Sequence, residues 1–210
     1  MKLADSTIRE FTNELASSSP APGGGSTAAV EASFGAGLLA MVCELTLGNK
    51  KYEEFYESVN DIKQAANDNK TRLLEIVDED TQAFNMVSTA FALPKNTDEE
   101  KQLRRQAIQA GLKESCLPPL NVLQEAYDCL ILGTKLINNY NTNTASDLGT
   151  AIASLRAAGQ GAYLNVLINI SSIKDEEFVL DVKKQADDYY QDILKLSKQM
   201  YETILKQLQS

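Results

Sequence analysis

Apolar side chains recur every three or four residues along most of this chain, which is the spacing of amphipathic helices. The pattern is clearest near the C-terminus, where one apolar stripe runs from Phe178 to Leu208. No segment shows the alternation of apolar and polar residues, bounded by tight turns, that is typical of β-hairpins. We therefore predict an all-α protein, a bundle of six to eight helices that forms one domain over residues 1–210.

Residues that start and stop helices divide this pattern into elements. Ser26 is a suitable N-cap for a helix that starts at about Thr27 and ends near Gly48, a suitable C-cap. Candidate N-caps of later helices are Thr97 or Asp98, and Ser146 or Asp147. The predicted helical segments cover about residues 5–16, 27–47, 52–91, 99–116, 120–137, 148–158, 161–173 and 176–208.

A glycine-rich loop precedes the most unusual of these helices. Gly23, Gly24 and Gly25 follow two prolines and lead into a helix built mostly of alanine, glycine and serine. Free backbone N–H groups at such a helix start lie at the positive end of the helix dipole and can hold an anion. A stretch of this kind is more often a simple loop before a closely packing helix, and composition alone leaves both interpretations open. The small side chains in either case predict a central, buried helix.

One carboxylate interrupts the apolar stripe of the long helix at residues 52–91. Asp80 stands on that stripe between Val77 and Phe84. A buried, unpaired carboxylate costs several kcal/mol when it is ionised, so we expect it to be hydrogen-bonded, paired or protonated. An aspartate with a displaced pKa is a candidate general acid or base. An aspartate that forms a salt bridge or caps another helix fits the pattern equally well.

Two further polar pairs stand out against their surroundings. Asn165 and Asn169 are four residues apart and share one face of an otherwise apolar helix. Amides on such a face either connect neighbouring helices or present donors and acceptors to a ligand. Lys50 and Lys51 form a small basic patch in an acidic chain, although two adjacent lysines are more often simply solvated.

Composition excludes several classes of function. The formal charge of −9 argues against general nucleic-acid binding. The chain has no histidine, which removes Ser-His-Asp catalysis and histidine-containing metal sites, so we expect no metal. Its three cysteines lie in apolar contexts without a Cys-x-x-Cys motif, as expected for reduced thiols in a cytoplasmic protein. No apolar run has enough large residues to suggest a membrane span.

Several stretches together resemble one known family. They are, in order, SSSPAPGGGSTAAVEASFGAGLLAMV, LTLGNKKY, VDEDTQAF, FALPK, NTASD and NVLIN. The ensemble is similar to the formiminotetrahydrofolate cyclodeaminase family over roughly residues 8–178. That family includes the deaminase half of glutamate formimidoyltransferase-cyclodeaminase and stand-alone bacterial proteins, some named methenyltetrahydrofolate cyclohydrolase. The chain has no room for the transferase half, so the resemblance implies a stand-alone member.

The resemblance implies a helical homodimer with a folate cleft near the subunit contact. The implied reaction closes 5-formiminotetrahydrofolate to 5,10-methenyltetrahydrofolate and releases ammonia, without a metal or organic cofactor. The proposed catalytic aspartate of the family lies in the VDEDTQAF stretch and corresponds to Asp80. The other positions that the resemblance implies are the cleft lining Gly23, Gly24, Gly25 and Ser26, the glutamate-tail lysines Lys50 and Lys51, the pterin-side amides Asn165 and Asn169, and a second carboxylate, Asp147.

Two other functions stay open at this point. The first is a cyclohydrolase, in which water opens methenyltetrahydrofolate to 10-formyltetrahydrofolate in the same pocket. The second is a helical scaffold or dimerisation module without chemistry. An intact PGGGS loop and a carboxylate on an apolar stripe argue against a scaffold, because neither feature contributes to stability unless it is used. We expect a small-molecule folate substrate and no nucleic-acid or membrane partner, with histidine degradation the usual setting of the deaminase.

Overall fold

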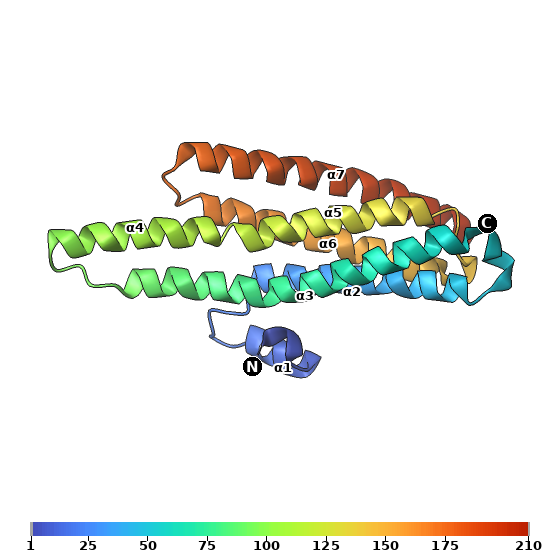
Figure 1. Cartoon of the computed structure of the whole chain (residues 1–210), viewed down its shortest axis with the longest axis horizontal. Coiled ribbons are helices and arrows are strands. Elements are labelled where there is room, and N and C mark those ends of the chain that lie inside the picture. Colours follow the sequence, from blue (N-terminus) through green and yellow to red (C-terminus); the bar gives the residue numbers. More distant parts are fainter. Residues whose placement is uncertain (1, 210) are drawn as a thin grey trace.

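A computed structural model of the chain describes residues 2–209, and over these residues it contains seven α-helices and no strand (Figure 1). The α-helices are α1 (Ile8–Leu15), α2 (Gly24–Leu47), α3 (Tyr56–Ala92), α4 (Asp98–Glu114), α5 (Leu117–Leu136), α6 (Ala145–Ile170) and α7 (Glu176–Gln209). Short 3₁₀ helices are η1 (Leu3–Asp5), η2 (Lys50–Phe55) and η3 (Thr142–Thr144). The predicted all-α fold is therefore confirmed.

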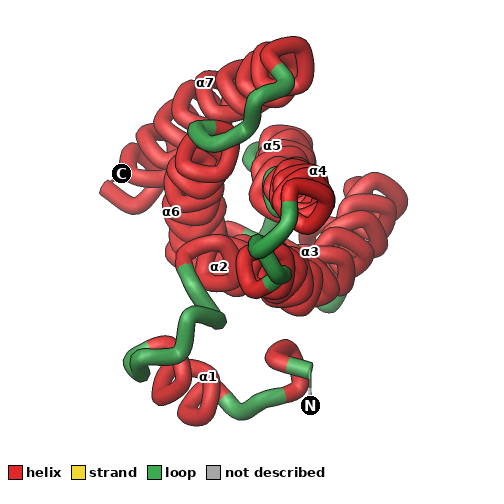
Figure 2. The backbone as a smooth tube through the Cα atoms, turned by 90° about the vertical axis from the view of Figure 1, so that its left-hand side faces the viewer, coloured by secondary structure: helices red, strands yellow, loops and turns green. Residues whose placement is uncertain are grey.

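The small-residue helix α2 lies in the middle of the bundle. It packs mainly against α3 on one side and α6 on another, with α5 also in contact (Figure 2). Buried alanines such as Ala32 and Ala36 allow these helices to approach closely. At Gly35 a methyl group would lie only 2.6 Å from Leu155 Cγ of α6. The prediction of a central, buried helix is confirmed.

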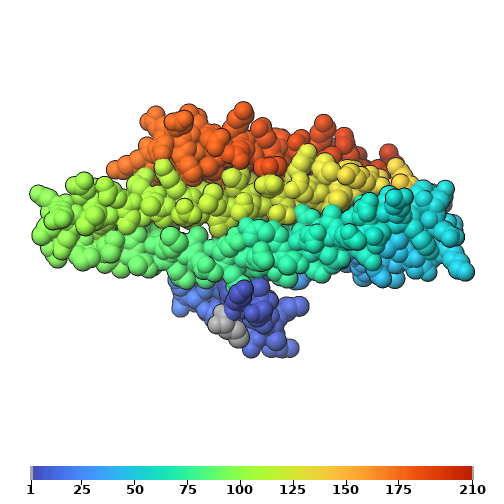
Figure 3. Space-filling model, in the orientation of Figure 1, coloured from blue at the N-terminus to red at the C-terminus, as the bar shows by residue number. Residues whose placement is uncertain are grey.

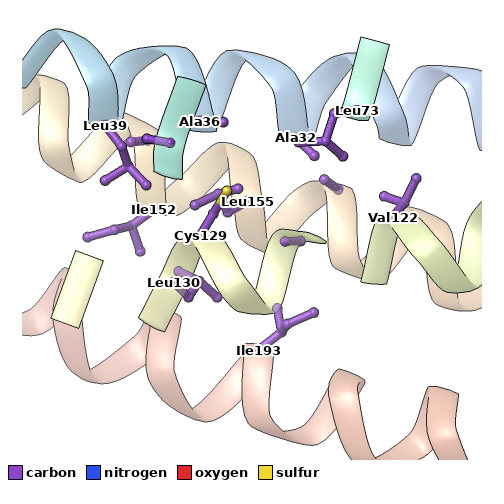
Figure 4. Close-up of a cluster of buried hydrophobic side chains, with 14 of the residues drawn as sticks. Ala32, Ala36, Leu39, Leu73, Val122, Cys129, Leu130, Ile152, Leu155 and Ile193 are labelled. Atoms are coloured by element: carbon purple, nitrogen blue, oxygen red, sulfur yellow. The ribbon is translucent and has the colours of Figure 1, made fainter. Parts of the chain in front are cut away.

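The core itself is formed by branched side chains that fill the space between the small residues of α2 and the other helices. In Figure 4 side chains from α2, α3, α5, α6 and α7 meet in one cluster. Leu39, Leu130, Ile152 and Ile193 are fully buried there. A helix that is apolar nearly all round, like α2, requires such contacts on several sides.

Helices α3 and α4 extend beyond the rest of the bundle as an antiparallel pair. With 37 residues, α3 is about 55 Å long at 1.5 Å per residue, and its C-terminal part continues past the start of α2 (Figures 1 and 3). Thr97 starts α4 with a capping box to Glu100, which confirms one of the two predicted N-caps. The proximal part of this pair forms one wall of the site described below.

The first helix stands apart from the bundle. A capping box between Thr7 and Glu10 starts α1, and Phe11 is its one buried side chain among the described residues. A linker then leads over the cis peptide bond between Ala21 and Pro22 to the start of α2. Figures 1 and 2 show α1 beneath α2, separated from the other helices.

Two of the predicted N-cap assignments were wrong. Helix α2 begins at Gly24, with Gly23 as the N-cap, so Ser26 lies inside the first turn and does not cap it. Helix α6 begins at Ala145 and continues to Ile170 without a break, so neither Ser146 nor Asp147 is its N-cap. In both cases the helix starts a few residues earlier, because a tertiary contact or a preceding 3₁₀ turn replaces the expected local cap.

By length and composition alone, α2 meets the criteria for a membrane-spanning helix, contrary to the expectation from the sequence. More than half of its most apolar stretch, 56%, is buried within the bundle. A core helix of a globular fold passes the same test.

Candidate functional site

The N-terminal end of α2 borders a cavity of about 310 Å³. Small-molecule sites have volumes of roughly 300–1,000 Å³, so this space suits part of a folate-sized ligand. Its walls come from the linker before α2, the start of α2, the middle of α3, the α4–α5 junction and the C-terminal half of α6. The lining residues are Pro20, Ala21, Gly23, Gly24, Gly25, Asp80, Phe84, Val87, Leu112, Ser115, Asn165 and Asn169.

Asp80 projects from α3 to the first turn of α2. The Ser26 hydroxyl donates a 2.7 Å hydrogen bond to Asp80 Oδ2, and the Ser26 backbone amide also lowers the pKa of this carboxyl group. Gly23 provides no side-chain bond at the N-cap. The carboxyl group of Asp80 thus lies against the first turn of α2, where an N-cap side chain usually lies. These contacts fit one interpretation of Asp80, in which it caps another helix. Its role as an acid or base stays a prediction.

Close approach to neighbouring side chains explains two of the three glycines at this helix start, Gly24 and Gly25. A methyl group on Gly25 would lie 2.2 Å from Asp80 Oδ1, and one on Gly24 would lie 3.0 Å from Asn165 Nδ2. Gly23 has no atom within 4 Å of the same position. No glycine among the described residues has a positive φ, so the backbone conformation itself does not require glycine here. Gly25 is needed because α2 begins directly against the catalytic candidate.

The electrostatics of the cavity depend on one group. Asp80 is the only titratable side chain among the described residues that line it. Burial raises the pKa of Asp80 above its ordinary value of 3.8, and the hydrogen bonds from Ser26 counteract this only in part. No group of three or more metal-ligating side chains comes together among residues 2–209. The site can therefore offer one exchangeable proton in an otherwise uncharged space.

The polar wall opposite α3 comes from α6. Asn169 Nδ2 donates a 2.6 Å hydrogen bond to the carbonyl oxygen of Ser115, which ties α6 to the α4–α5 junction. Asn165 Nδ2 donates to the carbonyl oxygen of Gly161 on its own helix. Both amides also line the cavity. The two interpretations of this pair are thus compatible, because Asn169 connects helices and both side chains lie where a ligand would bind.

Other lining residues were missed from the sequence. Phe84 and Val87 follow Asp80 on the same face of α3 and form an apolar wall, while Leu112 and Ser115 belong to the end of α4. For Phe84 the signal was present, since it continues the apolar stripe that contains Asp80. Nothing local marks Leu112 or Ser115, because only the packing of α4 against α3 brings them to the cavity.

Three predicted site residues lie elsewhere in the chain. Lys50 and Lys51 belong to η2, at the opposite end of α2 from the glycines, and α2 is about 36 Å long at 1.5 Å per residue. Asp147 lies in the first turn of α6, about 27 Å along that helix from Asn165. None of the three lines the cavity. The roles expected of them, Lys50 and Lys51 at the glutamate tail and Asp147 as a second carboxylate, stay predictions that this cavity does not support.

Comparisons with known proteins agree on one family. The family model described as formiminotransferase-cyclodeaminase matches residues 7–188. A methenyltetrahydrofolate cyclohydrolase from Methylorubrum extorquens is 35% identical over 94% of this chain and 95% of its own length. A formimidoyltransferase-cyclodeaminase from Mus musculus is 34% identical over 84% of this chain, but the match spans only 32% of the mouse protein.

The same relationship appears in three dimensions. The crystal structure of a formiminotetrahydrofolate cyclodeaminase from Thermotoga maritima superposes with a TM-score of 0.84 and 27% sequence identity. The superposition covers 99% of this chain and 98% of the Thermotoga chain.

Proposed function

Because this chain belongs to the formiminotransferase-cyclodeaminase family, we propose that it is an enzyme that converts a one-carbon derivative of tetrahydrofolate in the cavity beside Asp80. The first reaction we propose is the closure of 5-formiminotetrahydrofolate to 5,10-methenyltetrahydrofolate with release of ammonia. The observation that carries this proposal is a lone carboxyl group in an otherwise uncharged cavity, with its pKa raised by burial.

The reaction needs a group that moves one proton. N10 attacks the amidinium carbon held on N5, which forms the new C–N bond and leaves a proton on N10. The carboxylate of Asp80 accepts that proton and delivers it to the amino nitrogen of the tetrahedral intermediate. The C–N bond to this nitrogen then breaks and ammonia leaves. A carboxyl group with a raised pKa suits both halves of this transfer, because it is a stronger base than an ordinary aspartate and can still give the proton back.

The rest of the cavity supports this chemistry. The amidinium and the methenyl product are both cationic, and an ionised Asp80 is the one charge among the described lining residues that would stabilise them. The apolar side chains of Phe84 and Val87 suit a flat aromatic ring, while Asn165 and Asn169 can hydrogen-bond its polar edge. The binding roles of these residues, and the absence of any cofactor, are part of the proposal.

A second reaction is favoured by one comparison. The Methylorubrum relative, which matches over nearly its full length, is named a methenyltetrahydrofolate cyclohydrolase. In that reaction the carboxylate of Asp80 would take a proton from the water that attacks the methenyl carbon. The ring would then open to 10-formyltetrahydrofolate. Both reactions require the same carboxylate and the same cavity.

We also propose that two copies associate through α6. Exposed, uncharged residues follow one face of this helix at intervals of three and four, the spacing of a coiled-coil seam. They are Ser146, Thr150, Ala153, Ala157, Gln160, Leu164 and Ile168. Leu164 and Ile168 are 65% and 66% exposed, and Figure 2 shows α6 at the edge of the bundle, with the C-terminal end of α7 beside it. A second copy would cover this stripe.

The experiment that tests the reaction uses two cuvettes. In the first, the purified protein is mixed with 5-formiminotetrahydrofolate, and the near-ultraviolet band of the methenyl product and the release of ammonia are followed. In the second, methenyltetrahydrofolate is supplied and loss of that band is followed, with the rate in buffer subtracted.

Each outcome of these assays has a definite meaning. Appearance of the band together with ammonia establishes the cyclodeaminase. Loss of the band in the second cuvette alone establishes the cyclohydrolase. No change in either cuvette, with no effect of a tetrahydrofolate derivative on the melting temperature, would contradict the proposed function, since a bound ligand stabilises the folded state.

A further inference from the structure

Ser26 differs from the glycines that precede it. Gly23, Gly24 and Gly25 line the cavity, whereas Ser26 does not, and its exposed fraction is 0%. A substrate in the cavity therefore does not contact the Ser26 side chain. This departs from the expectation that Ser26 would bind the folate, and it leaves the function of a fully buried hydroxyl group to be explained.

The hydroxyl of Ser26 has one partner that matters for chemistry. It donates a 2.7 Å hydrogen bond to Oδ2 of Asp80 on α3, and the two residues are 54 positions apart in the sequence. Many other serine and threonine hydroxyls in this fold donate to a backbone carbonyl three or four residues earlier on their own helix, as Ser33 does to Val30. The Ser26 hydroxyl instead bonds to Asp80 and so connects α2 with α3.

We propose that Ser26 is a positioning residue, whose hydroxyl group holds Oδ2 of Asp80 so that Oδ1 exchanges the proton with the substrate. This inference rests on the proposed role of Asp80. The hydrogen bond fixes the rotation of the carboxyl group about its own axis, and the close backbone of Gly25 restricts it further. A hydrogen-bond donor on one oxygen also favours the ionised form, which is the form that accepts a proton from N10 or from water.

The surroundings of Asp80 make this effect measurable. The described lining residues of α2, α4, α6 and the α4–α5 junction carry no charge. On α3 itself, Glu79 is paired with Arg72, and Asp78 accepts the backbone amide of Leu3. The pKa of Asp80 is raised by burial and lowered by Ser26, with no charged group contributing. Loss of the Ser26 hydroxyl should therefore change the pKa of Asp80 directly.

The test is the pH dependence of turnover in a Ser26→Ala variant. Activity requires ionised Asp80, so the acidic limb of the kcat profile reports its pKa in the bound complex. Without the hydroxyl group this pKa rises, and the acidic limb should move to higher pH by about one pH unit. The KM on the plateau should stay the same, because Ser26 does not touch the substrate. Ser26→Cys, which retains a weak donor, should move the limb less in the same direction.

A matched control is available on the same helix. Ser33→Ala removes another buried hydroxyl of α2 that bonds to its own helix, and it should leave both the pH profile and the KM as in the parent protein. The inference is overturned if Ser26→Ala leaves the acidic limb in place or raises the KM several-fold. Failure of the proposed function would be detected separately, because an Asp80→Asn variant would then keep full turnover.

Discussion

At the scale of single residues, Asp80 combines a structural contact with a chemical requirement. Its carboxyl group accepts a hydrogen bond from Ser26 in the first turn of α2, yet burial raises its pKa. A group whose pKa is raised on folding binds protons more readily in the folded state, so the contribution of Asp80 to stability is greatest below its ordinary pKa of 3.8 and is lost as the pH rises through the raised value. Ionised Asp80 thus costs stability at neutral pH, which is the expected signature of a residue retained for function.

Asp80→Asn should separate these two effects. Asparagine is nearly isosteric and its side-chain oxygen can still accept the hydrogen bond from Ser26, so the fold should persist. Because the amide cannot move a proton, turnover should fall by about 100-fold or more. Because the buried charge is gone, unfolding in urea at neutral pH should show a gain in stability over the parent that shrinks as the pH is lowered toward 4.

Asp128→Asn is the matched control for this prediction. Asp128 is a half-buried aspartate on α5 whose pKa is also raised by burial, and it does not line the cavity. Its replacement should leave turnover within a factor of a few of the parent. If Asp80→Asn were no less active than Asp128→Asn, Asp80 would not be the proton-transfer group.

Gly25 makes a second prediction at this scale. In Gly25→Ala the new methyl group would lie 2.2 Å from Asp80 Oδ1, so either the carboxyl group or the first turn of α2 must move. A displacement of about 1 Å at a reacting group can cost 100-fold in rate, and we expect a loss of that order in kcat/KM.

Gly23→Ala provides the comparison for Gly25, two residues earlier in the chain. No atom lies within 4 Å of the added methyl group there, and the φ of −127° is accessible to alanine. This variant should retain kcat/KM within a few-fold. Equal losses in the two variants would mean that any substitution in the glycine loop is harmful, and that close approach to Asp80 is not the reason for Gly25.

At the scale of helices, the close packing of α2 against α6 can be tested with two further glycines. In Gly35→Ala the added methyl group would lie 2.6 Å from Leu155 Cγ and 3.1 Å from the carbonyl oxygen of Ala151. Overpacking of this kind should lower the free energy of unfolding by about 1–3 kcal/mol. The measurement is the midpoint of urea unfolding followed by circular dichroism.

Gly37→Ala is expected to have the opposite sign. Its new methyl group would have only Lys70 Cδ nearby, at 3.9 Å, and alanine is favoured over glycine in a helix by up to about 1 kcal/mol. The variant should be as stable as the parent or more so. Destabilisation by both substitutions would show that the helix tolerates no extra volume on either face, and that contact with α6 does not explain Gly35.

Most of the helices could be predicted because their signals are local. Apolar periodicity indicated the last helix within one residue of its observed end, and Thr97 was one of two residues predicted as the cap after a break. The start of α2 was misplaced because the Ser26 side chain, the expected cap, bonds to Asp80 of a different helix, and Gly23 is the N-cap. The capping box of Thr7 and Glu10 was present in the sequence and could have placed the start of α1 correctly.

At the scale of the whole molecule, the candidate site shows what local patterns cannot provide. Asp80, the glycines and the two asparagines were predicted from separate stretches, and packing brings them to one cavity. Spacing along the chain gave no indication that Lys50, Lys51 and Asp147 belong to the opposite end of the bundle. That separation follows from the lengths of α2 and α6, which are known only once helix boundaries are fixed.

The proposed association through α6 makes a geometric prediction about these two ends. The exposed stripe from Ser146 to Ile168 is centred on Ala157. If two copies pair antiparallel about this residue, the start of α6 in one copy lies beside the end of α6 in the other. Asp147 of one copy would then approach the region of Asn165 in the other copy. Residues that lie far apart within one chain would thus come close together in the dimer.

Cysteine substitutions on the stripe distinguish this arrangement from its alternatives. The three native cysteines are buried, so oxidation should join only introduced thiols. Ala157→Cys should form a covalent dimer on non-reducing gels, because each copy places this residue near the axis. Thr150→Cys alone should not, whereas Thr150→Cys mixed with Leu164→Cys should give a heterodimer, since an antiparallel seam centred on Ala157 sets residue 150 opposite residue 164. A cross-link by Thr150→Cys alone would indicate parallel helices, and no cross-link from any variant, with a monomeric mass in light scattering, would contradict association through α6.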